Sequence, residues 1–196
     1  MGIMETLDTE AIDKADMERL AQGHDAALNS LIERHSGPIF QFLYRMLGDE
    51  QDANDLAQET FVRVYRNRER FDGSKFTTWL YTIAGNLARN EYRRRGRHPV
   101  VSLNAEKGEG QLVLEDVLAS SHADPREAVE AEEQHQTVRA AVQQLPKELR
   151  EVLVLCEWEE MSAAEAASVL HTTSRAVESR LYRARRLLKD RLKRWL

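Results

Sequence analysis

Apolar residues recur at the spacing of an α-helix along most of this chain. Three amphipathic stripes lie in the first half, at residues 28–46, 57–65 and 76–87, and no run alternates with the period of a β-strand. Pro38 lies within the first stripe and predicts a break or kink there, because proline has no backbone N–H to donate. The pattern therefore predicts a helical bundle that ends near Arg95.

The helical pattern fails over residues 96–124, which contain three glycines and a proline and predict a linker. It restarts at Asp124-Pro125, where Asp124 suits an N-cap and Pro125 the first helical position. Four helices are expected from there, at about 125–144, 146–158, 162–170 and 174–194, with Ser162 and Glu165 as a capping box. The predicted fold is all-α, with two small helical domains joined by a flexible acidic linker.

The last two predicted helices form a candidate helix-turn-helix. Only His171-Thr172-Thr173 separates them, and the shorter one is rich in alanine, which allows two helices to cross closely. An ordinary helical hairpin is the alternative. In the longer helix, Val177, Leu181, Ala184 and Leu188 form a core side. The opposite side suits a helix in the DNA major groove and carries Arg175, Ser179, Tyr182, Arg183 and Arg186.

Glu178 lies at the flank of that face, near the start of the helix. A carboxylate there repels phosphate unless it accepts a hydrogen bond from a cytosine amino group. The alternative is that Glu178 simply interacts favourably with the helix dipole.

The helix at 76–95 also has a polar face opposite its apolar stripe. Arginine, amide and aromatic side chains gather there, a combination that suits phosphate contact, base hydrogen bonding and base stacking. Tyr81 and Tyr92 are the candidate stacking residues, whereas Trp79 lies in the stripe and is expected in the core. The preceding loop, Phe71 to Lys75, is placed to present a pocket.

Charge is segregated along the chain, although the net charge is −5, from 28 Lys+Arg and 33 Asp+Glu. Residues 1–60 carry four basic and thirteen acidic side chains, and residues 97–135 carry three basic and nine acidic side chains. The run 89–97 has five arginines, and residues 171–196 have nine basic side chains against two acidic ones. Two basic helices favour a polyanionic partner over two merely solvated faces.

Other classes of protein are disfavoured. One cysteine, Cys156, permits neither an internal disulfide nor a CxxC zinc pair, and its apolar neighbours place it in the core rather than as a redox sensor. No run of 18 apolar residues, signal pattern, phosphate-binding glycine loop, nucleophile elbow or HExxH motif occurs. We expect no catalytic residues, cofactor, metal, small-molecule substrate or membrane insertion, and a cytoplasmic location.

Three segments together resemble the extracytoplasmic-function sigma factors, the small group-4 members of the sigma-70 family. They are DANDLAQETFVRVYR, RFDGSKFTTWLYTIAGNLARNEYRRRGR and LPKELREVLVLCEWEEMSAAEAASVLHTTSRAVESRLYRARRLL. The resemblance implies sigma region 2 at residues 14–95, a linker at 96–124 and sigma region 4 at 125–196. It also implies binding to core RNA polymerase, through the β′ clamp and β flap, and initiation at specific promoters.

The resemblance assigns three sets of site residues. Core polymerase would bind at Asp55, Gln58, Glu59 and Arg63. The −10 element, as single-stranded DNA, would bind at Asp72, Gly73, Ser74, Lys75, Tyr81, Asn86, Arg89, Asn90, Tyr92 and Arg93. The −35 element, as duplex DNA, would bind at Ser174, Arg175, Glu178, Ser179, Tyr182, Arg183 and Arg186.

The chain departs from the family pattern at Arg175, where a small glycine is usual, and at Glu178, where a base is usual, so an altered −35 preference is expected. No sensor segment is visible, which implies regulation by an anti-sigma factor, with tethering to the membrane through it left open. An autonomous helix-turn-helix regulator that binds duplex DNA alone remains the alternative, and a helical adaptor without a DNA role is a third reading.

Overall fold

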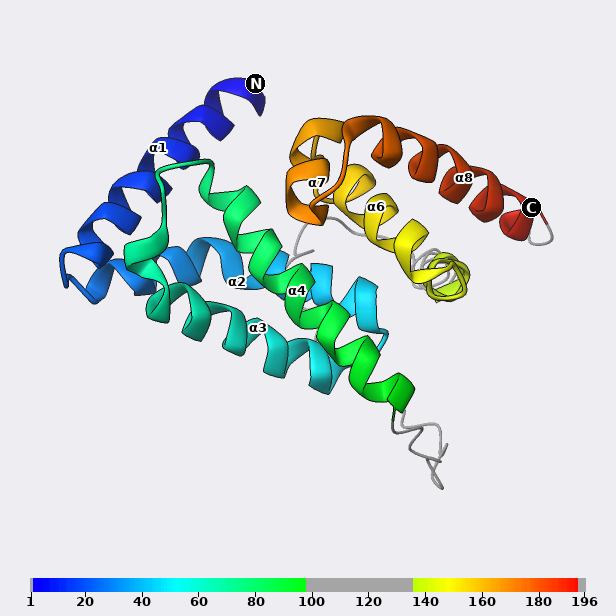
Figure 1. Cartoon of the computed structure of the whole chain (residues 1–196), viewed down its shortest axis with the longest axis horizontal. Helices are drawn as coiled ribbons and strands as arrows, with labels where there is room; N and C mark the ends of the chain where they lie inside the picture. The colour runs from blue at the N-terminus through cyan, green and yellow to red at the C-terminus, as the bar shows by residue number, and fades with distance from the viewer. Residues whose placement is uncertain (1, 98–135, 194–196) are drawn as a thin grey trace, which may run out of the picture.

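Two helical units make up the part of the chain that the structure, a computed structural model, describes: residues 2–97 and 136–193 (Figure 1). Every regular element in those two ranges is a helix. The N-terminal unit contains α1 (Gly2–Ala21), α2 (Ala26–Leu47), α3 (Glu50–Arg66), the 3₁₀ turn η1 (Arg68–Arg70) and α4 (Phe76–Arg97). The C-terminal unit contains a helical segment at 136–143, α6 (Lys147–Glu157), α7 (Ala163–Leu170) and α8 (Ser174–Leu192).

Helix α2 is the centre of the N-terminal unit, because α1, α3 and α4 all pack against it. Its buried side chains repeat at helical spacing, with Leu31, Ile39, Phe42 and Leu43 fully buried. The helix is not broken at Pro38, where the sequence predicts a break or kink: α2 continues through it to Leu47. The apolar side chains buried on both sides of the proline offset the lost backbone hydrogen bond, which costs about 3 kcal/mol.

Helix α1 has no counterpart among the predicted elements, and its buried face explains why. Over residues 9–21, where the side chains of α1 are described, the buried ones are Asp13, Asp16, Met17 and Leu20, two of them acidic. Arg34 donates to Asp13 (Nε to Oδ1, 2.9 Å) and to Asp16 (2.6 Å), and His35 Nε2 lies 2.8 Å from Asp13 Oδ2. The carboxylates are therefore paired within the structure, as buried charges must be.

The C-terminal helices lie close to their predicted positions. Ser162 accepts a hydrogen bond from the Glu165 amide, and the Glu165 side chain accepts one from the Ser162 amide, which confirms the predicted capping box. The predicted helix start at Asp124 and the linker at 96–124 (from residue 98 onward) lie outside the described residues. Cys156, expected in the core, is half-buried at the end of α6.

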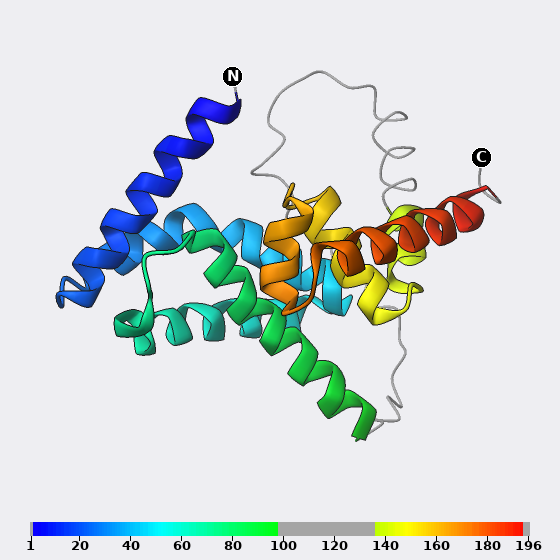
Figure 2. The ribbon, with the colours of Figure 1, turned by 45° about the horizontal axis from the view of Figure 1, so that its top comes forward.

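The two units pack against each other through α4 with α7 and through α2 with α6 (Figure 2). A single hydrophobic cluster runs across the contact, with Phe42, Tyr81 and Ala84 on one side and Val154 and Ala166 on the other. The sequence predicts the two helical units but not this docking, which determines how much of each predicted site is accessible.

Candidate nucleic-acid and polymerase interfaces

The predicted −35 face of α8 is fully accessible. All seven of its predicted residues are exposed, Tyr182 with 68% of its surface accessible. On the opposite side Val177 and Ala184 are buried, and Leu181 and Leu188 are partly buried against the core, as the sequence predicts. The exposed residues are Ser174, Arg175, Glu178, Ser179, Tyr182, Arg183 and Arg186.

A tight turn sets the angle between α7 and α8. His171 ends α7 in the left-handed conformation, with φ of 50°, and Thr173 caps α8 by accepting from the Ala176 amide at 3.2 Å. Val169 and Val177, one from each helix, are both fully buried. The two helices are thus joined as in a helix-turn-helix, with α8 as the outward-facing member.

The predicted −10 residues divide into an accessible and a covered group. Asp72 accepts from the Ser74 amide at 3.0 Å, which shapes the loop before α4, and Gly73 has φ of 78°, a conformation that favours glycine. The accessible residues are Asp72, Gly73, Ser74, Asn86, Asn90 and Arg93. The partly or fully covered ones are Lys75, Tyr81, Arg89 and Tyr92.

The two tyrosines predicted to stack on bases lie beneath the C-terminal unit. Tyr81 is 5% exposed, packs edge-on against Phe42 with ring centroids 5.1 Å apart, and donates its hydroxyl hydrogen to Glu159. Tyr92 donates to the Met46 carbonyl and accepts from Arg150 at 2.9 Å. In this arrangement neither ring presents a face to a base. Trp79, expected in the core, is half-buried.

Three glutamates of the C-terminal unit, Glu151, Glu159 and Glu165, contact the polar face of α4 and its preceding loop; we call them the interface glutamates. Glu165 Oε1 accepts from Lys75 Nζ at 2.6 Å, and Glu151 forms an ion pair with Arg89. Glu159 accepts from Tyr81 and lies 3.5 Å from Arg45. Each interface glutamate therefore pairs with at least one residue of the predicted −10 set.

Burial and pairing shift the interface carboxyls in opposite directions. Hydrogen bonds, from Lys75 foremost and then from Ser162, lower the pKa of Glu165 to about 2. Burial raises the pKa of Glu151 and of Glu159; Arg89 opposes the shift at Glu151, and the Tyr81 hydrogen bond and then the Arg45 charge oppose it at Glu159. Burial, reinforced by the Glu159 charge, likewise raises the pKa of Tyr81. The Glu165 contact is thus an ordinary ion pair, while the other two glutamates bear a desolvation cost at neutral pH.

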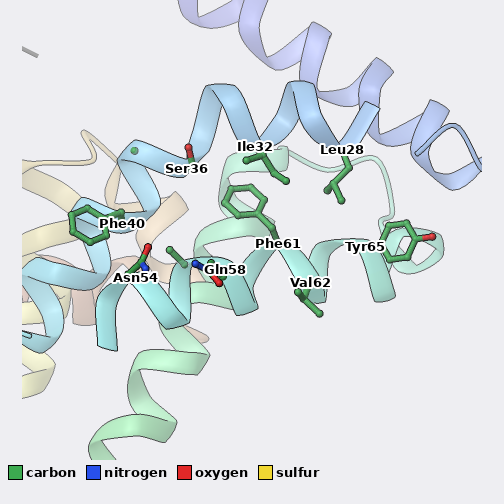
Figure 3. Close-up of a pocket in the computed structure, with 11 residues that line it drawn as sticks. Leu28, Ile32, Ser36, Phe40, Asn54, Gln58, Phe61, Val62 and Tyr65 are labelled. Carbon is green, nitrogen blue, oxygen red and sulfur yellow. The ribbon is translucent and has the colours of Figure 1, made fainter. Parts of the chain in front are cut away.

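An apolar groove runs between α2 and α3 and holds about 560 Å³ (Figure 3). Of the four predicted polymerase-binding residues, only Gln58 lines it; Asp55 is exposed nearby, and Glu59 and Arg63 pair with each other at 2.9 Å. Its apolar lining is Leu28, Ile32, Phe40, Ala57, Phe61, Val62 and Tyr65. Val62, 39% exposed, extends the apolar lining of the groove to the protein surface.

Sequence reasoning missed this groove and the interface glutamates. Val62 is an apolar residue that does not belong to the buried face of α3. Its position in the sequence could have indicated a second apolar surface on this helix. No comparable signal marks the glutamates, because acidic residues on a helix are usually solvated. Within residues 2–97 and 136–193, no helix is long and apolar enough to span a bilayer.

Comparison with known proteins identifies both units. Residues 31–98 match Sigma-70 region 2, and residues 135–188 match Sigma-70 region 4. The RNA polymerase sigma-H factor of Pseudomonas aeruginosa is 37% identical over 182 residues, which cover 90% of this chain and 92% of that protein. The chain belongs to the extracytoplasmic-function (ECF) sigma factors of the sigma-70 family. It is a transcription initiation factor that directs core RNA polymerase to promoters.

Further relatives agree with this assignment. The ECF RNA polymerase sigma factor SigW of Bacillus subtilis is 32% identical over 186 residues, 94% of this chain and 98% of that one. CnrH, solved with the cytosolic domain of CnrY, has a TM-score of 0.68 and 27% identity over 93% of this chain and 97% of that chain. The sigma factor RpoE of Bartonella quintana, solved with the anti-sigma factor NepR, has a TM-score of 0.64 and 23% identity. The match covers 84% of this chain and 96% of that chain, and it supports the fold.

Proposed function

We propose that region 2 extends over residues 14–95 and region 4 over residues 125–196, and that each contributes a separate interface to the promoter complex. The observation that carries this proposal is the α8 face, where seven polar or charged side chains lie exposed opposite a buried apolar row. A helix that only completed a hairpin would not need to concentrate three arginines opposite its core.

At the −35 element, α8 enters the major groove of duplex DNA. Arg183 and Arg186 are placed to donate to guanine or to phosphate, and Glu178 to accept from a cytosine amino group. Because Arg175 and Glu178 depart from the family pattern, the preferred −35 sequence differs from that of relatives with glycine and a basic residue there. The protein acts in the bacterial cytoplasm.

At the −10 element, the 72–75 loop and the polar face of α4 bind the unpaired strand. Lys75, Arg89 and Arg93 supply positive charge for phosphates, and Asn86 and Asn90 supply amides for base edges. Tyr81 and Tyr92 join this surface once region 4 no longer covers them and their side chains turn away from Phe42 and the Met46 carbonyl of α2.

Core polymerase binds region 2 at the α2–α3 groove and the adjoining polar face of α3. An amphipathic helix of the β′ clamp fits a groove with an apolar floor and polar residues at its edge. Asp55, Gln58, Glu59 and Arg63 supply those polar contacts. An anti-sigma factor is a further partner, supported by the solved complex of the relative CnrH with the cytosolic domain of CnrY.

Reconstitution with core polymerase that lacks sigma tests the function, with transcription measured from a library of −35 and −10 sequences. We expect a complex and initiation from promoters that share one pair of elements. Absence of a complex, with tight duplex binding by the protein alone, would instead establish an autonomous regulator.

A matched pair of variants tests recognition by α8. Arg183→Ala should cost about 1–3 kcal/mol at a single −35 base position. Arg185→Ala is the control, because Arg185 is also exposed on the same helix but donates to Glu157 at 2.7 Å. A loss for Arg183→Ala that is uniform across all promoter variants would contradict base recognition by this residue.

A further inference from the structure

The interface glutamates contact cationic and hydrogen-bond-donating side chains that belong to the proposed −10 DNA surface. Glu165 pairs with Lys75, Glu151 with Arg89, and Glu159 with Tyr81. They come from three successive parts of region 4: Glu151 from α6, Glu159 from the turn after it, and Glu165 from α7. A carboxylate and a phosphate compete for the same cations and N–H or O–H donors, so one donor cannot serve both at once.

The contact between the regions is closely packed. A Cβ added at Gly85, in the middle of α4, would lie 3.5 Å from Glu151 Oε1 and 3.4 Å from an Arg89 nitrogen. One added at Gly48, at the end of α2, would lie 2.9 Å from the Gln143 side chain. The distances at Gly85 are ordinary van der Waals contacts, and the atoms met at Gly48 are the far end of the flexible Gln143 side chain, so region 4 touches region 2 at both places. Tyr81, whose hydroxyl donates to Glu159 of region 4, is 5% exposed.

The other two interfaces remain open in the same arrangement. The seven predicted residues of the α8 face are all exposed, and the lining of the α2–α3 groove contains no residue of region 4. Region 4 thus covers one of the three proposed interfaces and leaves the polymerase and −35 interfaces accessible.

We propose that the structure is a closed state in which the three interface glutamates of region 4 occupy the −10-binding donors of region 2, so that region 4 must leave α4 before single-stranded −10 DNA can bind. The assignment of the donors rests on the proposed function, whereas the closed state itself rests on the contacts described. Closure acts as an internal competitor for promoter DNA. Polymerase can still engage the open groove, and its separation of the two regions would release the −10 surface.

The composition of the interface fits a contact that has to open. The side chains of Glu151 and Glu159 are only 10% and 8% exposed, and the resulting desolvation cost reduces the net gain from their ion pairs. The turn that presents Glu159 contains Glu160 in the left-handed conformation, with φ of 50°, which is uncommon for a residue with a side chain. The apolar contact provides the attraction, and the glutamates provide the specificity for the −10 donors.

The test compares two sets of three substitutions in the full chain. The first is Glu151→Gln, Glu159→Gln and Glu165→Gln, in which glutamine can retain the capping box. The control is Glu148→Gln, Glu160→Gln and Asp190→Asn, which makes the same change in net charge at exposed acids of region 4. Both sets are made with Cys156→Ser, and dyes are attached at Glu69→Cys and Lys189→Cys, exposed positions on the two regions.

We expect the interface set to lower the energy transfer between the dyes, and to raise the affinity of the free protein for a single-stranded −10 oligonucleotide at least fivefold. The oligonucleotide is the strand selected in the reconstituted transcription assay. The control set should change either quantity less than twofold. Gly85→Leu is an independent variant that wedges the interface without removing a carboxylate, and it should lower the energy transfer as well.

The closed state is overturned if the wild type already shows the low energy transfer of separated regions, or if neither the interface set nor Gly85→Leu changes energy transfer or DNA affinity. These outcomes are distinct from failure of the proposed function. That failure appears as no transcription by wild-type protein with core polymerase, and the energy-transfer comparison still decides closure in that case.

Discussion

Replacing Asp13 with alanine tests how α1 is held on region 2. The Asp13 carboxylate has no accessible surface, and it accepts from Arg34 Nε at 2.9 Å and from His35 Nε2 at 2.8 Å. The His35 ring in turn packs on Phe76, the first residue of α4, with centroids 5.2 Å apart. Loss of the carboxylate therefore affects α1, α2 and the start of α4 together.

The size of the effect follows from what remains after the substitution. Removing one partner of a buried ion pair costs about 3–5 kcal/mol, since the other charge stays desolvated. Arg34 keeps its bond to Asp16 at 2.6 Å and is partly solvated, so we expect the lower end, about 3 kcal/mol. This corresponds to about a hundredfold in the unfolding equilibrium constant. Asp13→Asn keeps one acceptor oxygen and should cost about 1–2 kcal/mol.

Urea unfolding followed by far-ultraviolet circular dichroism measures the loss, with calorimetry for the melting temperature. For a unit of this size, a loss of 3 kcal/mol should lower the melting temperature by about 10 °C or more. Glu18→Ala is the control, because Glu18 is exposed on the same helix and should change stability by less than about 0.5 kcal/mol. A loss below 1 kcal/mol for Asp13→Ala would show that α1 is not held by this network.

Three further predictions concern the groove, the contact between the regions and Glu165. Val62→Glu should weaken core polymerase binding at least about tenfold by placing a charge in the apolar groove. Gln51→Glu, on the same helix, is the control and should not weaken binding. Equal affinities of Val62→Glu and wild type in a competition assay would rule out the groove as the polymerase site. Gly48→Ala should cost about 1 kcal/mol in urea unfolding because φ is 73°, and should leave interdomain energy transfer nearly unchanged because the flexible end of Gln143 can move aside. A large fall in energy transfer would show that Gln143 is fixed in place. The depressed pKa of Glu165 means that its stabilising contribution is complete above pH 4.5 and is lost as the pH falls through about 2. Titration of the Glu165 carboxyl, followed by NMR, measures this pKa. A midpoint near 4.5 would show that the ion pair is absent in solution.

Much of the fold follows from local sequence features. The stripes at 57–65 and 76–87 became α3 and α4, and the capping box at Ser162 became the start of α7. The arrangement of α8, with Val177 inward and Arg183 outward, also follows from a helical wheel. These features depend on residues within about four positions of one another, so the sequence alone contains them.

Where local patterns were incomplete or opposed by packing, the sequence was a poorer guide. Pro38 predicts a break or a kink, and the break does not occur because buried neighbours on both sides keep α2 continuous. The buried face of α1 contains Asp13 and Asp16, which have no apolar periodicity, so the helix was missed. Their burial depends on Arg34, 21 and 18 residues away, and a pairing at that distance is decided by the packing of two helices.

The sequence by itself determined the helical class, the helix-turn-helix and the family, because these depend on periodicity, caps and motifs. Only the tertiary structure decided which proposed DNA contacts are accessible. Arg89 and Glu151 are 62 positions apart, Tyr81 and Glu159 are 78 apart, and Lys75 and Glu165 are 90 apart. Each of these side chains alone is an ordinary charged or polar residue on a helix or loop. Their pairing comes from the burial of apolar surface between two domains, a property of the assembled fold that no short stretch of sequence contains.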